Sequence, residues 1–199
     1  MKPIFQIIFL LLIYSCSRDQ SKESLGFNNQ MAPKRYFLKS SENVSVNGDT
    51  VYLNRKKYSG FIYQLYPKTN DTISLEGFKN GLLTGICRKW YPNTQLMEER
   101  VYSDGKKNGR QIAYWENGNK KFEFFAKNDA YEGELKEWAF DGKLIHLAHY
   151  LNGQEEGAQK LWYDSGKIRA NYIVIKGKRY GLLGTKNCKN VSDSIFVTK

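Results

Sequence analysis

Histidine and carboxylate side chains are the first candidates for chemistry in this chain of 199 residues. His146 and His149 are the only two histidines, and a spacing of three along a strand points them to opposite faces, so they cannot bind one metal ion together. Glu132 and Glu134 can share a strand face, but nothing in the pattern marks either carboxyl group as buried. No nucleophile–histidine–acid order, phosphate-binding loop or dinucleotide-binding fingerprint occurs. The sequence therefore predicts a protein that is not an enzyme and that needs no metal or cofactor.

Cys16 is the residue whose position predicts a covalent modification. It follows a short basic start and the apolar residues 4–13, a stretch that is too short to cross a bilayer and is typical of a signal peptide. The segment Ile13-Tyr14-Ser15-Cys16 resembles the lipobox of bacterial lipoproteins, although Tyr14 stands where a small residue is usual. We therefore expect residues 1–15 to be a signal peptide and Cys16 to be the lipid attachment site. An ordinary secretory leader, cut near Ser15 or Ser17, is the alternative.

Regularly spaced glycines predict the elements of the remaining chain. A glycine recurs with a nearly constant period of about 24 residues, at Gly60, Gly85, Gly109, Gly133, Gly157 and Gly181. Another glycine stands four positions before each of the last five, except that Asp129 takes this place once. Two-residue hairpin turns are predicted at Asn117-Gly118, Asp141-Gly142 and Ser165-Gly166. The predicted repeat-turn glycines are Gly60, Gly81, Gly85, Gly105, Gly109, Gly118, Gly133, Gly142, Gly153, Gly157, Gly166, Gly177 and Gly181.

Bulky residues recur in register with these glycines. An aromatic residue follows the second glycine of a repeat by five positions, at Trp90, Tyr114, Trp138 and Trp162. We expect these four side chains to form a ladder on one face of a sheet, with equivalent residues about 10 Å apart. Cross-strand pairs of about 0.2 to 1 kcal/mol each would make this ladder the framework of the fold. An aromatic groove for a peptide or a glycan is the alternative.

The repeats predict an all-β fold, an open single-layer antiparallel meander of five tandem β-hairpins. The expected organisation is a signal peptide (1–15), an acylated cysteine with a flexible tether (16–43), a divergent N-terminal hairpin cap (44–59), five hairpin repeats (60–184) and a C-terminal tail (185–199). The recurring Trp-Tyr, Asn-Gly and Asn-Gly-Lys-x-x-Gly elements resemble the MORN repeat, in the bacterial variant form of the YwqK-type antitoxin family. The resemblance implies an extended hairpin sheet that acts as a scaffold, and it implies an antitoxin as a further candidate function.

Two cysteines lie in or after the repeats, at Cys87 and Cys188. About four repeats separate them, which is about 40 Å along an open sheet. Because the Cα atoms of a disulfide lie about 4.4 to 6.8 Å apart, only strong curling of the sheet would join them. We expect Cys87 to be a strand residue and Cys188 to be a free thiol.

Charge bears on partners rather than on fold. The formal net charge is +11, and lysines such as Lys143 and Lys167 follow the hairpin glycines. Lysines at exposed turns protect sheet edges and keep a protein soluble; attraction to an anionic envelope polymer is the alternative. We expect a lipid-anchored bacterial envelope protein, in the outer rather than the inner membrane, that binds an envelope protein or an anionic polymer and no nucleic acid. An antitoxin that neutralises a cognate toxin is the second hypothesis.

Overall fold

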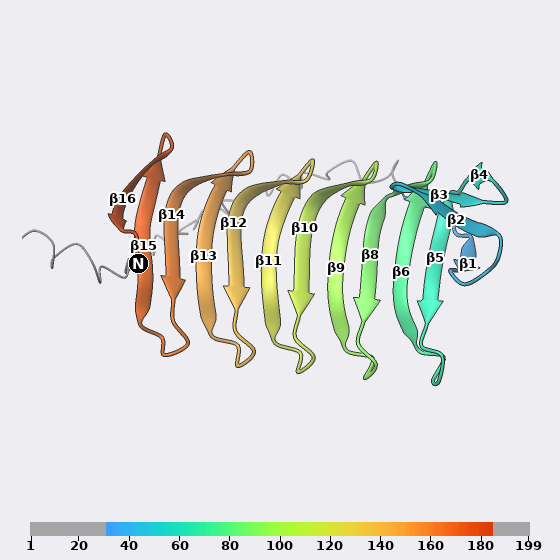
Figure 1. The fold of residues 1–199 in the computed structure, drawn as a ribbon, viewed down its shortest axis with the longest axis horizontal. Helices are drawn as coiled ribbons and strands as arrows, with labels where there is room; N and C mark the ends of the chain where they lie inside the picture. Colours follow the sequence, from blue (N-terminus) through green and yellow to red (C-terminus); the bar gives the residue numbers. More distant parts are fainter. Residues whose placement is uncertain (1–30, 185–199) are drawn as a thin grey trace, which may run out of the picture.

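A computed structural model describes residues 31–184, and this part of the chain is all-β. Its strands form one long sheet with a small second sheet at one end (Figure 1). The strands are β1 (Tyr36–Leu38), β2 (Val44–Asn47), β3 (Thr50–Leu53), β4 (Lys56–Lys57), β5 (Gly60–Leu65), β6 (Thr72–Lys79), β7 (Leu82–Leu83), β8 (Gly85–Trp90), β9 (Leu96–Ser103), β10 (Lys106–Tyr114), β11 (Lys120–Lys127), β12 (Ala130–Trp138), β13 (Leu144–Leu151), β14 (Gln154–Trp162), β15 (Ile168–Ile175) and β16 (Lys178–Leu182).

The long sheet confirms the predicted meander of hairpins. Its 13 strands follow chain order from β5 to β16, with β1 beside β5 and with β7 paired to β6. Neighbouring strands pair antiparallel, except that β1 pairs parallel with β5. Because an antiparallel pair needs only a short connection, each repeat adds two strands to the end of the growing sheet. The result is one extended layer whose strands stand side by side along its length (Figure 1).

Two-residue turns connect the strands along one edge of the sheet, which we name the turn edge and which lies at the top of Figure 1. Ser103 pairs with Lys106, and between them Asp104 and Gly105 have φ angles of 49° and 82°. Positive φ at both central residues defines a type I′ turn, whose twist matches that of the flanking strands. Asp129 replaces glycine in one of these turns, and its carboxylate accepts a hydrogen bond of 2.9 Å from the backbone N–H of Lys107.

Longer connections follow the opposite edge, the loop edge. The N–H of Trp115 donates to the carbonyl of Asn119 (2.7 Å), and the N–H of Gly118 donates back to the carbonyl of Trp115 (2.9 Å). Three residues therefore lie inside this hairpin, which combines a type I turn with a following residue of positive φ. The prediction of two-residue turns at Asn117-Gly118 and its two equivalents is wrong: the two-residue turns lie on the turn edge.

The second glycine of each predicted G-x-x-x-G turn belongs to a strand. At Gly109, Gly133 and Gly157 the pairing register of β10, β12 and β14 shifts, which marks a β-bulge. Gly109 has a φ of 116°, and a Cβ atom there would come within 3.2 Å of Val101 Cγ1. These three glycines are bulge residues, so their assignment to turns is corrected. The same correction applies to Gly60 and Gly85, which begin β5 and β8, and to Gly181, which lies within β16.

The turn edge also carries backbone links between repeats. The N–H of Gly105 donates to the carbonyl of Leu83 in the preceding repeat (2.8 Å). The N–H of Asp129 donates in the same way to the carbonyl of Lys107 (3.0 Å). Because a bulge bends its strand, it brings each turn back toward the preceding one.

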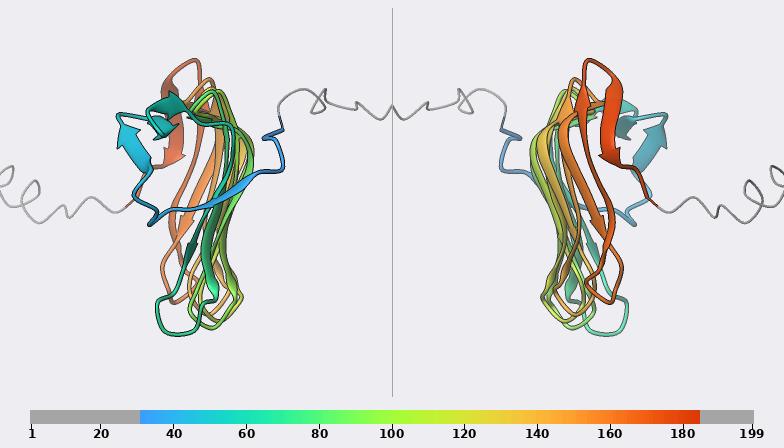
Figure 2. Two further views of the ribbon diagram at one scale, coloured as in Figure 1. Left: turned by 90° about the vertical axis from the view of Figure 1, so that its right-hand side faces the viewer. Right: turned by 90° about the vertical axis from the view of Figure 1, so that its left-hand side faces the viewer.

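The N-terminal end of the sheet is covered on its edge and on one face. β1 falls within the range 16–43 that the sequence assigned to a flexible tether, yet it pairs with β5, so ordered structure begins before residue 43. β2, β3 and β4 form the second sheet, and Val51 and Tyr58 pack on Ile62 and Phe78 of the long sheet. We name the face that carries this contact the inner face. It is the concave side of the curved long sheet (Figure 2).

Residues 31–184 contain no helix of the length and apolarity that a bilayer span requires.

Candidate functional site on the sheet faces and edges

The predicted aromatic ladder lies on the outer face, away from β2 and β3. Trp90, Tyr114, Trp138 and Trp162 occupy equivalent positions at the ends of β8, β10, β12 and β14, and all four side chains are half-buried. Each pairs with the first residue of the next strand, so a residue of that strand stands between successive members. Lys120 fills one such place, with its Nζ atom 5.4 Å from the centroid of the Trp138 ring.

A second column of side chains links the repeats along the loop edge. The hydroxyl groups of Tyr66 and Tyr91 donate hydrogen bonds to the carbonyls of Trp90 and Tyr114 in the next repeat (2.9 and 3.0 Å). The indole Nε1 of Trp115 donates in the same way to the carbonyl of Trp138 (3.0 Å). These residues directly follow the end of a strand, at the place next to the ladder position, and the hydrogen bonds give that place a structural role.

Asparagines of the same loops add further links between repeats. Asn117 Oδ1 accepts from the N–H of Asn119 (3.0 Å), while its Nδ2 donates to the carbonyl of Phe140 in the next loop (2.8 Å). Asp141, in the equivalent place one repeat later, accepts from the N–H of Lys143 (3.1 Å) but has no amide donor. Ala139 likewise has no donor where the preceding repeat has Trp115. Both side-chain links are therefore interrupted between the fourth and fifth repeats.

Two buried glutamines on the inner face were missed by the sequence analysis. The exposed fraction of both Gln111 and Gln159 is 0%. Gln111 Nε2 donates to the carbonyl of Val101 (2.9 Å), and Gln159 Nε2 donates to the carbonyl of His149 (2.8 Å). Each glutamine follows its bulge glycine by two positions, a spacing that was visible in the sequence as Gly-x-Gln. The Oε1 atoms of both are buried without a hydrogen-bond partner among the described residues.

The inner face also carries an aromatic cluster, made of Phe122, Phe124, Tyr131 and Tyr150. The Tyr131 ring lies 4.7 Å from the Phe124 ring and 5.0 Å from the Tyr150 ring, between centroids. Arg100 extends the cluster, with its guanidinium carbon 4.6 Å from the centroid of Phe122. Phe124 is buried, whereas 39% of Tyr131 is exposed. The cluster therefore stabilises the sheet and at the same time presents an aromatic surface.

Several charged residues of this face form ion pairs. Glu98 binds both Lys89 (2.9 Å) and Arg100 (3.1 Å), and Glu155 binds Arg179 (2.8 Å). Burial alone would raise the pKa of the Glu98 carboxyl, but the hydrogen bond from Lys89 and the charge of Arg100 hold that pKa below its usual range. This lowered pKa keeps the Glu98 carboxylate ionised beside its two cationic partners.

The two histidines lie apart, as their spacing predicts. His146 Nδ1 is 2.9 Å from Glu137 Oε2 on the inner face, and this hydrogen bond lowers the pKa of the Glu137 carboxyl. His149 Nδ1 is 3.3 Å from the carbonyl oxygen of Ala158. No cluster of three or more metal-ligating side chains occurs within residues 31–184.

Cys87 occupies the position of Gln111 one repeat earlier and is buried. Burial raises the pKa of its thiol to about 11, against a smaller lowering by a backbone hydrogen bond from Gly77. A thiol with this pKa is a poor nucleophile near neutral pH. Cys16 and Cys188, for which lipid attachment and a free thiol were predicted, lie outside the described residues.

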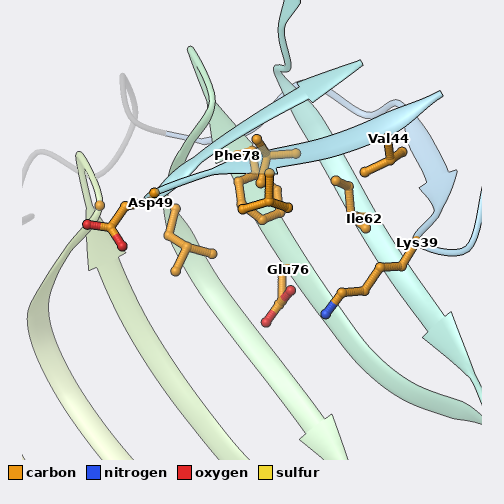
Figure 3. A pocket seen from close by; sticks show the side chains of 11 residues that line it. Lys39, Val44, Asp49, Ile62, Glu76 and Phe78 are labelled. Atoms are coloured by element: carbon orange, nitrogen blue, oxygen red, sulfur yellow. The ribbon is translucent and has the colours of Figure 1, made fainter. Parts of the chain in front are cut away.

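A pocket of about 230 Å³ lies between the β2–β3 hairpin and the inner face (Figure 3). Its walls are mainly apolar, with Val44 from the hairpin and Ile62 and Phe78 from the long sheet. Lys39 and Glu76 also line the pocket, and their side chains point toward one another (Figure 3). The pocket has the apolar walls and the few polar groups of a small binding site.

One hairpin in the middle of the array is similar to a known repeat family. Residues 107–128 match the MORN repeat variant. The matched stretch takes in most of β10, the loop that contains Gly118, and β11. A search of curated proteins gives no match. The hairpin formed by β10 and β11 is therefore similar to a MORN repeat variant.

Proposed function

We propose that this protein is a non-catalytic binding module, held at the bacterial cell envelope by a lipid on Cys16. In this proposal the inner face of the hairpin sheet binds another envelope protein or an envelope polymer. The observation that carries the proposal is the aromatic cluster on the inner face, which no element within residues 31–184 covers at Tyr131.

The physical argument rests on the contrast between the two ends of this face. At the N-terminal end, the β2–β3 hairpin buries Ile62 and Phe78. Farther along, Tyr131 and Tyr150 lie on the same face without such a cover. Tyrosine is enriched at binding interfaces because its ring supplies a large apolar area and its hydroxyl group can form a hydrogen bond. The ring contacts also hold these side chains in place before a partner binds, which lowers the entropic cost of binding.

A site-specific crosslink tests the position of the binding face. We would replace Tyr131 by a photoreactive phenylalanine derivative, irradiate whole envelopes, and identify the adducts. The matched control places the same derivative at Phe125, which is 54% exposed on the outer face of the neighbouring strand. Adducts to one defined partner from position 131 and not from position 125 are expected. Equal adducts from both positions would remove the inner face from the proposal.

The lipid anchor has its own test. Fatty-acid labelling of the full-length protein is expected, and it should be lost in Cys16→Ala. Labelling that persists in Cys16→Ala, or that is absent from the wild type, would contradict the anchor without bearing on the binding face.

The proposal of an anionic polymer as partner predicts in addition that binding weakens as salt is raised, because added ions screen exposed charges.

An antitoxin-like role is the second candidate, and it rests on the resemblance of the repeat sequence to the YwqK-type antitoxin family. It predicts that a toxic neighbouring gene is neutralised by expression of this protein. Neutralisation that requires Tyr131 would give both candidates the same binding surface.

A further inference from the structure

The C-terminal edge of the long sheet differs from the N-terminal edge. At the N-terminal edge β1 covers β5, and the N–H of Phe61 donates to the carbonyl of Arg35 (2.6 Å). At the other end, β16 pairs with β15 alone among the strands within residues 31–184, and all five of its residues are exposed. An uncovered edge strand presents a row of free N–H and C=O groups and tends to pair with another strand.

Leu183, near this edge, is much more exposed than the equivalent residues of the earlier repeats. It follows Gly181 by two positions, as Gln111 follows Gly109. Its equivalents in the earlier repeats are all buried, with exposed fractions of 6% at Cys87, 0% at Gln111, 5% at Leu135 and 0% at Gln159. Leu183 is 55% exposed. The earlier residues lie within strands that have a neighbouring strand on both sides, whereas Leu183 directly follows the last residue of β16, which has a neighbour on one side only.

The pairing of β16 with β15 is also simpler than that of its equivalents. No register shift occurs between the pair Ile175–Lys178 and the pair Asn171–Leu182. In contrast, β10, β12 and β14 each contain a bulge at the glycine that corresponds to Gly181. The bulged strands all lie between two neighbours. The last strand of the array therefore lacks both the second neighbour and the bulge that accompany this position elsewhere.

The period of the array indicates which segment belongs beside β16. The strands that follow a loop-edge connection begin at Thr72, Leu96, Lys120, Leu144 and Ile168, and each is eight residues long. One further period places the next such strand on residues 192–199, which include the run Ile195-Phe196-Val197. β-Branched and aromatic residues of this kind suit the pleated, half-buried surface of a strand.

The same period also aligns individual residues of the C-terminal segment with residues of the earlier strands. Gln111 pairs with Phe124, Leu135 with Ala148, and Gln159 with Tyr172, so the corresponding partner of Leu183 is Phe196. Asn190 falls at the loop position where Asn70 has a φ of 60° and Gly118 has a φ of 86°. Asparagine tolerates this conformation better than most residues.

We propose that residues 192–199 of this chain add a further antiparallel strand to the long sheet, with Phe196 beside Leu183 on the inner face. The open edge of β16 is then an acceptor for the chain's own C-terminal segment. The proposal concerns this edge alone and does not depend on the proposed binding function.

Substitutions at two adjacent positions test the strand and its orientation. Phe196→Asp places a charge against Leu183 and should speed amide hydrogen exchange in β16 by about tenfold or more, because exchange follows local opening. Ile195→Glu is the matched control: its equivalents include Glu99 and Glu123 on the outer face, so exchange in β16 should change little. Equal exchange in the wild type and Phe196→Asp would overturn the proposal.

Disulfide trapping distinguishes this segment from other occupants. In the full chain with Cys16, Cys87 and Cys188 changed to Ser, the pair Leu183→Cys and Phe196→Cys should form an intramolecular disulfide, since directly opposed Cα atoms lie about 4.5 to 5.5 Å apart. Leu183→Cys combined with Ile195→Cys should crosslink poorly, because the second thiol faces the other side. Failure of the first pair to crosslink would contradict the proposal. A disulfide-linked dimer would do so as well, and would assign the edge to a second copy of the chain.

Discussion

The side-chain amide of Gln111 donates a hydrogen bond to the carbonyl oxygen of Val101 across the pair β9–β10, over 2.9 Å. The contact lies beside the bulge at Gly109, where regular pairing of the two strands is interrupted. Gln159 makes the same contact with His149 two repeats later (2.8 Å). In a single-layer sheet, a buried side chain that bonds to the backbone beside a bulge stabilises the point where the ladder is weakest.

Gln111→Ala should therefore destabilise the protein. It removes one hydrogen bond and leaves a cavity under the inner face, for a loss of about 2 kcal/mol in the free energy of unfolding. Chemical denaturation measures this loss. Lys127→Ala, at an exposed position of β11, is the control and should change stability by less than about 0.5 kcal/mol. Equal effects of the two substitutions would show that the Gln111 contact adds nothing.

Restoring the interrupted links between the fourth and fifth repeats should stabilise the array. Ala139→Trp and Asp141→Asn supply the donors that Trp115 and Asn117 provide one repeat earlier. Each new hydrogen bond is expected to add about 0.5 to 1.5 kcal/mol, measured by thermal or chemical unfolding. The reverse change, Trp115→Phe, should lower stability by a similar amount. A double variant no more stable than the wild type would contradict the role assigned to this column.

Trp138→Ala tests the predicted ladder. The Trp138 side chain is half-buried and contacts Lys120, so its removal should cost about 2 kcal/mol and lower the melting temperature. Calorimetry provides the measurement. Unchanged melting combined with loss of partner binding would indicate instead that the outer face is a binding groove.

The Cys87 thiol should be protected in the folded state. With its pKa raised to about 11, thiol reagents at a mildly alkaline pH should modify Cys87 much more slowly in native protein than in denaturant. The unfolded thiol ionises near a pH of about 8.5. Cys87 therefore contributes stability that is fully present below about pH 8.5 and is lost as the pH rises through about 11. Cys87→Ser should remove this part of the alkaline loss, and an unchanged pH profile would refute it.

Local sequence determined the architecture. The regular glycine period predicted the hairpin array, because positive φ angles and tight strand connections require particular residues at fixed places. The aromatic residues at a fixed offset from these glycines marked equivalent strand positions. The same local signals also misled, since Asn-Gly occurs both in two-residue turns, as at Asn152-Gly153, and in the longer loop at Asn117-Gly118.

Contacts between strands determined the features that the sequence period does not predict. A bulge is a property of two paired strands, so Gly109 could be distinguished from a turn glycine only by the register against β9. Phe124, Tyr131 and Tyr150 form one cluster because neighbouring strands bring them to the same face, although their offsets within the repeats differ. The pairing of β1 with β5 likewise depends on a contact between segments that share no pattern. The sequence by itself determined the repeat, and the packing of strand on strand decided which side chains are buried and which surface is left for a partner.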